Sequence, residues 1–96
     1  MAGNVKTDAA AQVTGLTYPC SFPLKLFVRP DAAVEARLQA LVKSELPADA
    51  PVEVERRASA NGNYVCLTLT FTAEDEARLT RIIKATGADP GVVLAL

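Results

Sequence analysis

Cys20 and Cys66 are the residues with the most distinctive chemistry in this chain, since a thiol can act as a nucleophile, a metal ligand or half of a disulfide. The chain has no histidine and no Cys-x-x-Cys, so the commonest general base and the commonest zinc ligand are both missing. One chain cannot assemble a structural zinc site from two thiols alone. We therefore expect two inert, reduced thiols, no metal and no cofactor.

The carboxylates suggest no catalytic pair either. Glu53 and Glu55 share one face of an alternating segment, but Arg57 follows on that face, and charges on an edge strand explain all three. The Gly-containing segment 60–63 is typical of a hairpin turn and does not open a helix as a phosphate-binding loop would. Together with the missing histidine, this argues against an enzyme.

The charge balance argues against nucleic acid and membranes as partners. Ten Lys and Arg against eleven Asp and Glu give a net charge of −1, so no global positive field attracts a polyanion. Arg78, Arg81 and Lys84 follow acidic residues along one predicted helix, the order that complements a helix dipole. Arg56 and Arg57 could meet an anion or an acidic partner, although such residues more often protect an edge strand.

The composition is that of one globular domain, with 50% apolar and 22% charged residues among 96. No segment resembles a signal peptide or a transmembrane helix. We expect a cytoplasmic protein with a flexible N-terminal tail at residues 1–16 and a folded domain at 17–96.

Three segments, residues 22–29, 52–55 and 64–72, show the period-2 alternation of strands. Residues 92–96 are all apolar and are predicted to form a last strand. Two further segments show helical spacing. The first helix is predicted over residues 32–46 with Asp31 as its N-cap. The second is predicted to open at a variant capping box beginning at Thr72, to carry Thr86 at the margin of its apolar stripe, and to end before Gly87 at the C′ position.

The resulting order, βαββαβ, predicts an α+β ferredoxin-like two-layer sandwich, with two helices on one face of a four-stranded antiparallel sheet in the order 4-1-3-2. Strand parity places Lys25, Phe27, Thr68 and Thr70 on the open face, which is our candidate interaction surface. Cys66 should then lie beside Phe27, too far from Cys20 for a disulfide. RNA-binding domains of this topology carry aromatic residues on the open face of the third strand, and these stack on bases. The corresponding positions here are Cys66, Thr68 and Thr70, so nucleic-acid binding is not expected.

The last predicted strand is an uncharged edge, and uncharged edges invite pairing. Val92, Leu94 and Leu96 are expected to face the helices, leaving Val93 and Ala95 outward. We expect either the N-terminal tail or a second copy of the chain, in a weak homodimer, to cover this edge.

Two local motifs go beyond the generic pattern. Residues 18–26, Tyr-Pro-Cys-Ser-Phe-Pro-Leu-Lys-Leu, resemble the aromatic-Pro-x-x-Phe-Pro-(Ile/Leu)-Lys-Val opening of the YbeD-like family, small bacterial proteins with a domain of unknown function. Residues 59–64 are similar to that family's Ser-x-x-Gly-x-Tyr segment, and Ser59, Gly62 and Tyr64 match the motif by position. The resemblance implies a ferredoxin-like, ACT-like domain without enzymatic activity and with a suggested regulatory role.

These observations favour an uncharacterised, non-catalytic regulatory or protein-interaction module with an unknown protein partner. The alternative is an ACT-like sensor of a small metabolite at a dimer interface. Against that alternative, Val28-Arg29-Pro30 stands where the family usually has Gly at the ligand-binding turn. A weaker third hypothesis is an acylphosphatase-type enzyme; it would need a phosphate-cradling loop at Arg29, but the following Pro30 has no N–H to donate.

Overall fold

The computed structural model describes residues 15–95. Most of the predicted tail and Leu96 lie outside the described residues. The elements are β1 (Cys20–Val28), α1 (Ala32–Ser44), β2 (Glu53–Ala58), β3 (Val65–Ala73), α2 (Glu76–Gly87) and β4 (Val92–Ala95). Within residues 15–95, neither helix is long and apolar enough to cross a membrane.

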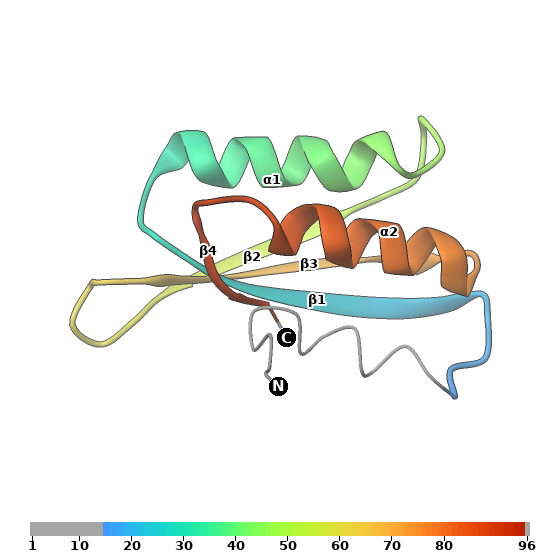
Figure 1. Cartoon of the computed structure of the whole chain (residues 1–96), viewed down its shortest axis with the longest axis horizontal. Helices are drawn as coiled ribbons and strands as arrows, with labels where there is room; N and C mark the ends of the chain where they lie inside the picture. The colour runs from blue at the N-terminus through green and yellow to red at the C-terminus, as the bar shows by residue number, and fades with distance from the viewer. Residues whose placement is uncertain (1–14, 96) are drawn as a thin grey trace.

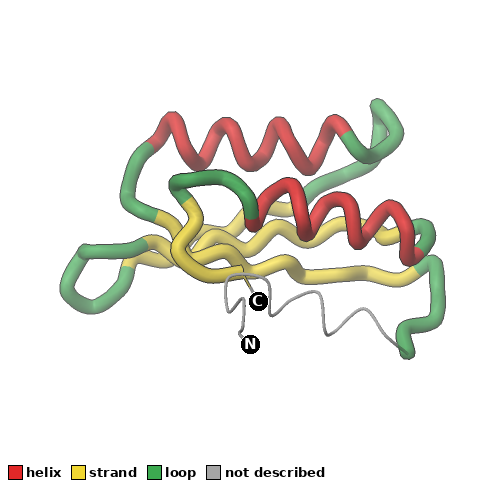
Figure 2. Tube along the Cα trace, viewed as in Figure 1, coloured by secondary structure: helices red, strands yellow, loops and turns green. Residues whose placement is uncertain are grey.

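The four strands form one antiparallel sheet in the order β2-β3-β1-β4, as predicted. Both helices lie on the same side of this sheet, and the β2–β3 hairpin extends beyond them at one end (Figure 1). The tube view shows the same two layers, with the loops gathered at the ends of the strands (Figure 2). The ferredoxin-like α+β sandwich is confirmed.

The core lies between the sheet and the helices because apolar residues alternate on the central strands and recur with helical spacing on α1 and α2. On β1, Leu24, Leu26 and Val28 are completely buried, and the buried residues of β3 are Val65, Leu67, Leu69, Phe71 and Ala73. The helices contribute Val34, Leu38 and Val42 from α1, and Leu79, Ile82 and Ile83 from α2. This parity leaves the alternate residues of each strand on the other face of the sheet.

Both helices begin at an aspartate. The Asp31 carboxylate accepts a hydrogen bond from Ala33 N–H at 2.9 Å, as predicted for α1. For α2 the prediction of a capping box at Thr72 is wrong. Asp75 is the N-cap and accepts from Arg78 N–H at 2.7 Å, because Thr72 and Ala73 still belong to β3 and pair with Ser21 and Cys20.

The end of α2 also differs from the prediction. Gly87 is the last helical residue and lacks a positive φ, and Ala88 forms the C-cap by donating to the Lys84 carbonyl. Thr86 is completely buried instead of lying at the margin of the apolar stripe. Its hydroxyl donates to the Ile82 carbonyl one turn earlier, and this satisfies the buried polar group.

The last strand keeps its predicted position at the edge but loses the predicted alternation. Val28 pairs with Val92 and Phe27 pairs with Leu94, so the register shifts and Val93 is the extra residue. This shift interrupts the strict alternation that the prediction for residues 92–96 assumed. Val92 is buried and Val93 is 38% exposed.

The loop between α2 and β4 is held against α1 by an ion pair. Arg37 donates two hydrogen bonds to the Asp89 carboxylate, at 2.6 and 2.7 Å, and Asp89 also accepts from Gly91 N–H at 2.8 Å. The Gly91 carbonyl then accepts from Arg29 N–H after β1. These contacts join the middle of α1, the end of β1 and the entry to β4.

Candidate functional site: the open face of the sheet

The open face is the side of the sheet away from the two helices. All four predicted interaction residues, Lys25, Phe27, Thr68 and Thr70, occupy strand positions that alternate with buried core residues, so they lie on this face. The register pairs Lys25 with Thr68, and the neighbouring row on this face pairs Phe27 with Cys66. The predicted nearness of Cys66 to Phe27 is thus confirmed. The use of Lys25, Phe27, Thr68 and Thr70 as an interaction surface stays a prediction.

The centre of the open face is a shallow trough. Its floor is β3, whose outward residues are small, and its walls are the longer outward side chains of β1 and β2. The floor consists of Cys66, Thr68, Thr70 and Thr72, and the walls are Lys25 and Phe27 on one side and Glu53, Glu55 and Arg57 on the other. Same-face neighbours on adjacent strands lie side by side, so Cys66 lies between Phe27 and Arg57, and Thr68 lies between Lys25 and Glu55. Thr70 has Glu53 on the β2 side and Pro23 on the β1 side.

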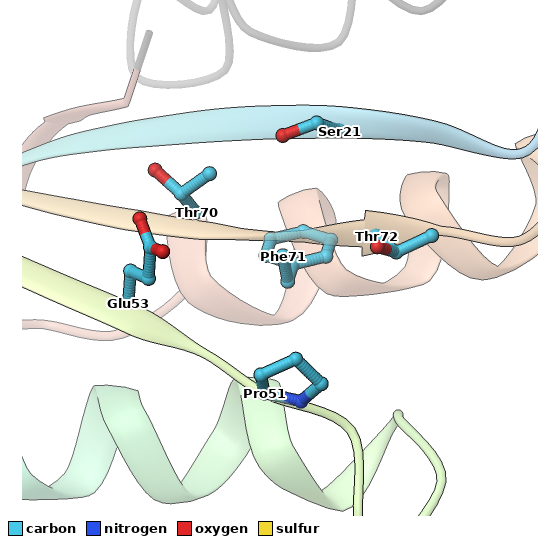
Figure 3. A pocket seen from close by; sticks show the side chains of 6 residues that line it. All are labelled: Ser21, Pro51, Glu53, Thr70, Phe71 and Thr72. Atoms are coloured by element: carbon cyan, nitrogen blue, oxygen red, sulfur yellow. The ribbon is translucent and has the colours of Figure 1, made fainter.

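One end of the trough is polar. A hollow of about 140 Å³ is lined there by Ser21, Pro51, Glu53, Thr70, Phe71 and Thr72. Figure 3 shows Ser21, Thr70 and Glu53 coming from three neighbouring strands, with Pro51 in the loop that leads into β2. Three hydroxyls and one carboxylate can exchange hydrogen bonds with a polar partner, but they provide no activated nucleophile.

The other end of the trough is apolar and cationic. A hollow of about 240 Å³ is lined there by Phe27, Arg57, Ala58, Ser59, Tyr64 and Cys66. An adjoining hollow of about 130 Å³ shares Arg57 and Cys66 with it and adds Lys25, Glu55 and Thr68. Each candidate interaction residue therefore lines one of these three hollows, two of which adjoin.

The hairpin turn with the Ser-x-x-Gly-x-Tyr motif closes the apolar end. Gly62 has φ of +76°, as predicted, and its N–H donates to the Ser59 carbonyl. Ser59 holds Tyr64 from both sides: Ser59 N–H donates to the Tyr64 carbonyl at 2.8 Å, and Tyr64 N–H donates to the Ser59 hydroxyl at 3.1 Å. The motif thus fixes the position of an aromatic residue that is 40% exposed at the rim of the hollow.

Two neighbouring arginines on β2 have different surroundings because they face opposite sides of the sheet. Arg56 lies on the helix side and donates to both carboxylate oxygens of Glu35 on α1, at 2.9 and 3.1 Å. These hydrogen bonds raise the pKa of Arg56 above its usual value. Arg57 lies on the open side and has no hydrogen bond or ion pair with any residue between 15 and 95.

The thiols do not form a reactive site together. Cys20 pairs with Ala73 and Cys66 with Phe27, at opposite ends of the β1–β3 ladder, and neither forms a disulfide. Among residues 15–95, no three Asp, Glu or Cys side chains cluster in a way that could hold a metal ion. The arrangement on the open face is suited to binding.

Sequence reasoning missed the contribution of Arg57, Cys66 and Tyr64 to the open-face hollows. The signal was available, because the parity of 53, 55 and 57 already put Arg57 on the same face as Glu53 and Glu55. Only the packed hairpin shows that Tyr64 and Ser59 complete a hollow with Phe27.

Comparison with solved structures supports the fold. The solution structure of protein HP0495 from H. pylori aligns with a TM-score of 0.70 and 18% sequence identity, over 99% of this chain and 98% of that one. At this identity the likeness shows a shared fold.

Sequence comparison shows the family. A model described as a protein of unknown function (DUF493) matches residues 14–96. The UPF0250 protein of Leptothrix cholodnii is 37% identical over 92 residues, covering 93% of this chain and 98% of that protein. The UPF0250 protein of Nitrosomonas europaea is 30% identical over 81 residues, covering 84% and 93% respectively. The chain therefore belongs to the DUF493 family, the YbeD-like small bacterial proteins of unknown function.

Proposed function

We propose that this protein is a non-catalytic regulatory module that acts by binding another protein through the open face of its sheet. The observation that supports this most directly is the trough along β3. Its walls carry charges of both signs, with Lys25 and Arg57 accompanied by Glu53 and Glu55, and none of these four forms an ion pair within residues 15–95. A partner with complementary charges would engage groups that the fold itself leaves unpaired.

The chemistry of the face also favours binding over catalysis. The chain has no histidine, and the only carboxylates that line the three hollows beside the β3 threonines are Glu53, next to Thr70, and Glu55, next to Thr68. A carboxylate beside a threonine hydroxyl, with no histidine between them, does not make the nucleophile, base and orienting group of a nucleophilic site. A small non-catalytic module is consistent with this arrangement.

The test is affinity capture from native cells with matched variants. Thr68→Arg places a large cation on the trough floor, and Lys84→Glu changes a charge on the exposed side of α2 as a control. We expect a protein captured by the wild type and by Lys84→Glu, identified by mass spectrometry, to be lost with Thr68→Arg. Equal capture by all three forms would contradict binding through this face.

An ACT-like sensor at a dimer interface is the second candidate. The observation that favours it is the short pairing of β4, which covers only Leu26, Phe27 and Val28 of β1 and leaves an edge for a second copy. Sedimentation of the purified chain with and without free amino acids would reveal ligand-dependent association. A sedimentation coefficient that no amino acid changes would count against this candidate.

A further inference from the structure

The apolar hollow beside the hairpin combines features that the interaction role alone does not require. At about 240 Å³ it is larger than the other two hollows of the open face. Its lining comes from all three strands β1, β2 and β3 and from the turn that joins β2 to β3. A concave site of this kind, mostly apolar with one or two fixed polar groups, is the usual form of a small-molecule site.

The apolar part of the lining consists of two aromatic rings and a thiol. Phe27 and Cys66 are cross-strand partners, and Tyr64 lies two residues before Cys66, at the exposed rim. Aromatic side chains offer a large apolar surface at a low entropic cost. Two hydrogen bonds with Ser59 fix the backbone of Tyr64, from which the ring projects.

The polar part is the guanidinium of Arg57, which has no hydrogen-bond or ion-pair partner within residues 15–95. Arg57 lines both the apolar hollow and the adjoining one, and the second positive charge at this end is Lys25. The one acid nearby is Glu55, which lines the adjoining hollow and precedes Arg57 by two residues on the same face. The three groups together carry a net positive charge, and the planar fork of an arginine matches the geometry of a carboxylate.

We propose that this hollow binds a small organic carboxylate: the carboxylate on Arg57, and an attached apolar or aromatic group between Phe27 and Tyr64. The hollow lies just below the usual range of about 300–1,000 Å³ for ligand pockets, so the ligand is of fragment size. This inference is independent of the protein-binding role, since it needs only the purified chain.

The test is a titration of the full-length protein, labelled with ¹⁵N, with 3-phenylpropionate, followed by amide chemical shifts. The neutral 3-phenylpropanamide has the same shape and serves as the ligand control. We expect saturable shifts centred on Phe27, Arg57, Tyr64 and Cys66, and about tenfold weaker binding of the amide. The chain itself supplies a matched control, because Arg56→Gln changes the neighbouring arginine on the opposite face.

Arg57→Gln should remove the preference for the carboxylate over the amide, while Arg56→Gln should retain it. Three results would overturn the proposal: no saturable shift at millimolar probe, equal affinity for the acid and the amide in the wild type, or equal losses in the two arginine variants. In a folded variant, the amide shifts of residues away from the hollow match those of the wild type. The same spectra therefore distinguish a variant that no longer binds the probe from one that no longer folds. Partner capture without probe binding would refute this ligand and leave the proposed function standing.

Discussion

Gly62 shows how a single residue allows the hairpin to close. Its φ of +76° lies in the left-handed region, which residues other than Gly, Asn and Asp rarely adopt. A Cβ added there would meet no atom within 4 Å, so space is available and only the backbone conformation is demanding. The cost of substitution should therefore depend on the backbone preference of the new residue and hardly on its size.

Gly62→Val should lower the free energy of unfolding by at least ~1 kcal/mol, measured by chemical denaturation. Gly62→Asn should cost clearly less, because asparagine tolerates positive φ. Equal losses for both variants would show that the backbone conformation is not the cause.

Tyr18, just before β1, supports a prediction about pH. Burial, followed by the negative charges of Glu76, Cys20 and Asp75, raises the pKa of its phenol above the usual 10.0. Because the pKa in the folded protein lies above that in the unfolded chain, folding favours the neutral phenol. Its contribution is fully present below about pH 10 and is lost as the pH rises through the folded-state pKa.

An absorbance titration of Tyr64→Phe, in which Tyr18 is the only tyrosine left, should give a midpoint above 10.0. The free energy of unfolding should fall less for Tyr18→Phe than for Tyr64→Phe between about pH 9 and about pH 11. A midpoint at or below 10.0 would contradict the assigned environment.

Among the secondary-structure elements, β3 separates the two faces of the sheet residue by residue. Leu69 is completely buried under the helices, whereas Thr68 is part of the trough floor. Leu69→Ala should cost ~2–5 kcal/mol in unfolding free energy through loss of core contacts. Thr68→Ala should cost well under that amount. Similar costs in denaturant titrations would show that the assignment of the two faces is wrong.

The α2–β4 loop meets α1 so closely that it needs a glycine. A Cβ at Gly91 would lie 2.5 Å from Val34 Cγ1 and 2.9 Å from Val34 Cγ2, closer than carbon atoms pack. Gly91→Ala should therefore destabilise the protein by ~1–3 kcal/mol. In a Val34→Ala background the same change should cost less, because the clashing methyl groups are gone. Additive losses in this double-mutant cycle would rule out the contact as the cause.

For the whole molecule, the open question is association through the β4 edge. This strand pairs with three residues of β1 and exposes Val93 at a register shift. A bulge at an edge strand hinders pairing with a second chain, so the bulge at Val93 acts against association. The absence of charged side chains on β4 favours association. We expect a weak homodimer at tens of micromolar protein.

Sedimentation at increasing concentration measures this directly, and Val93→Lys should shift the distribution towards monomer. An unchanged dimer in that variant would place the interface elsewhere. A monomer at every concentration would exclude the homodimer.

The sequence by itself determined the order of elements, the parity of β1, β2 and β3 and thereby the two faces of the sheet. These follow from local periodicity: Leu24 and Leu26 must share a side because side chains alternate along a strand. Gly62 and Asp31 were also predictable, since turn and cap preferences depend on the residue and its nearest neighbours. The two motifs identified the family for the same reason, as short contiguous segments.

Contacts between distant segments decided the rest. Thr72 looks like a helix cap in isolation, but pairing with Ser21 keeps it in β3 and moves the cap to Asp75. The shift at Val93 depends on how β4 meets β1, which no alternation within β4 encodes. Arg56 and Arg57 are identical in type, yet Glu35 of α1 engages only Arg56, because only the tertiary structure brings that helix over one face of the sheet. The hollow on the other face exists for the same reason: its walls come from three strands and a turn, and they meet only in the folded chain.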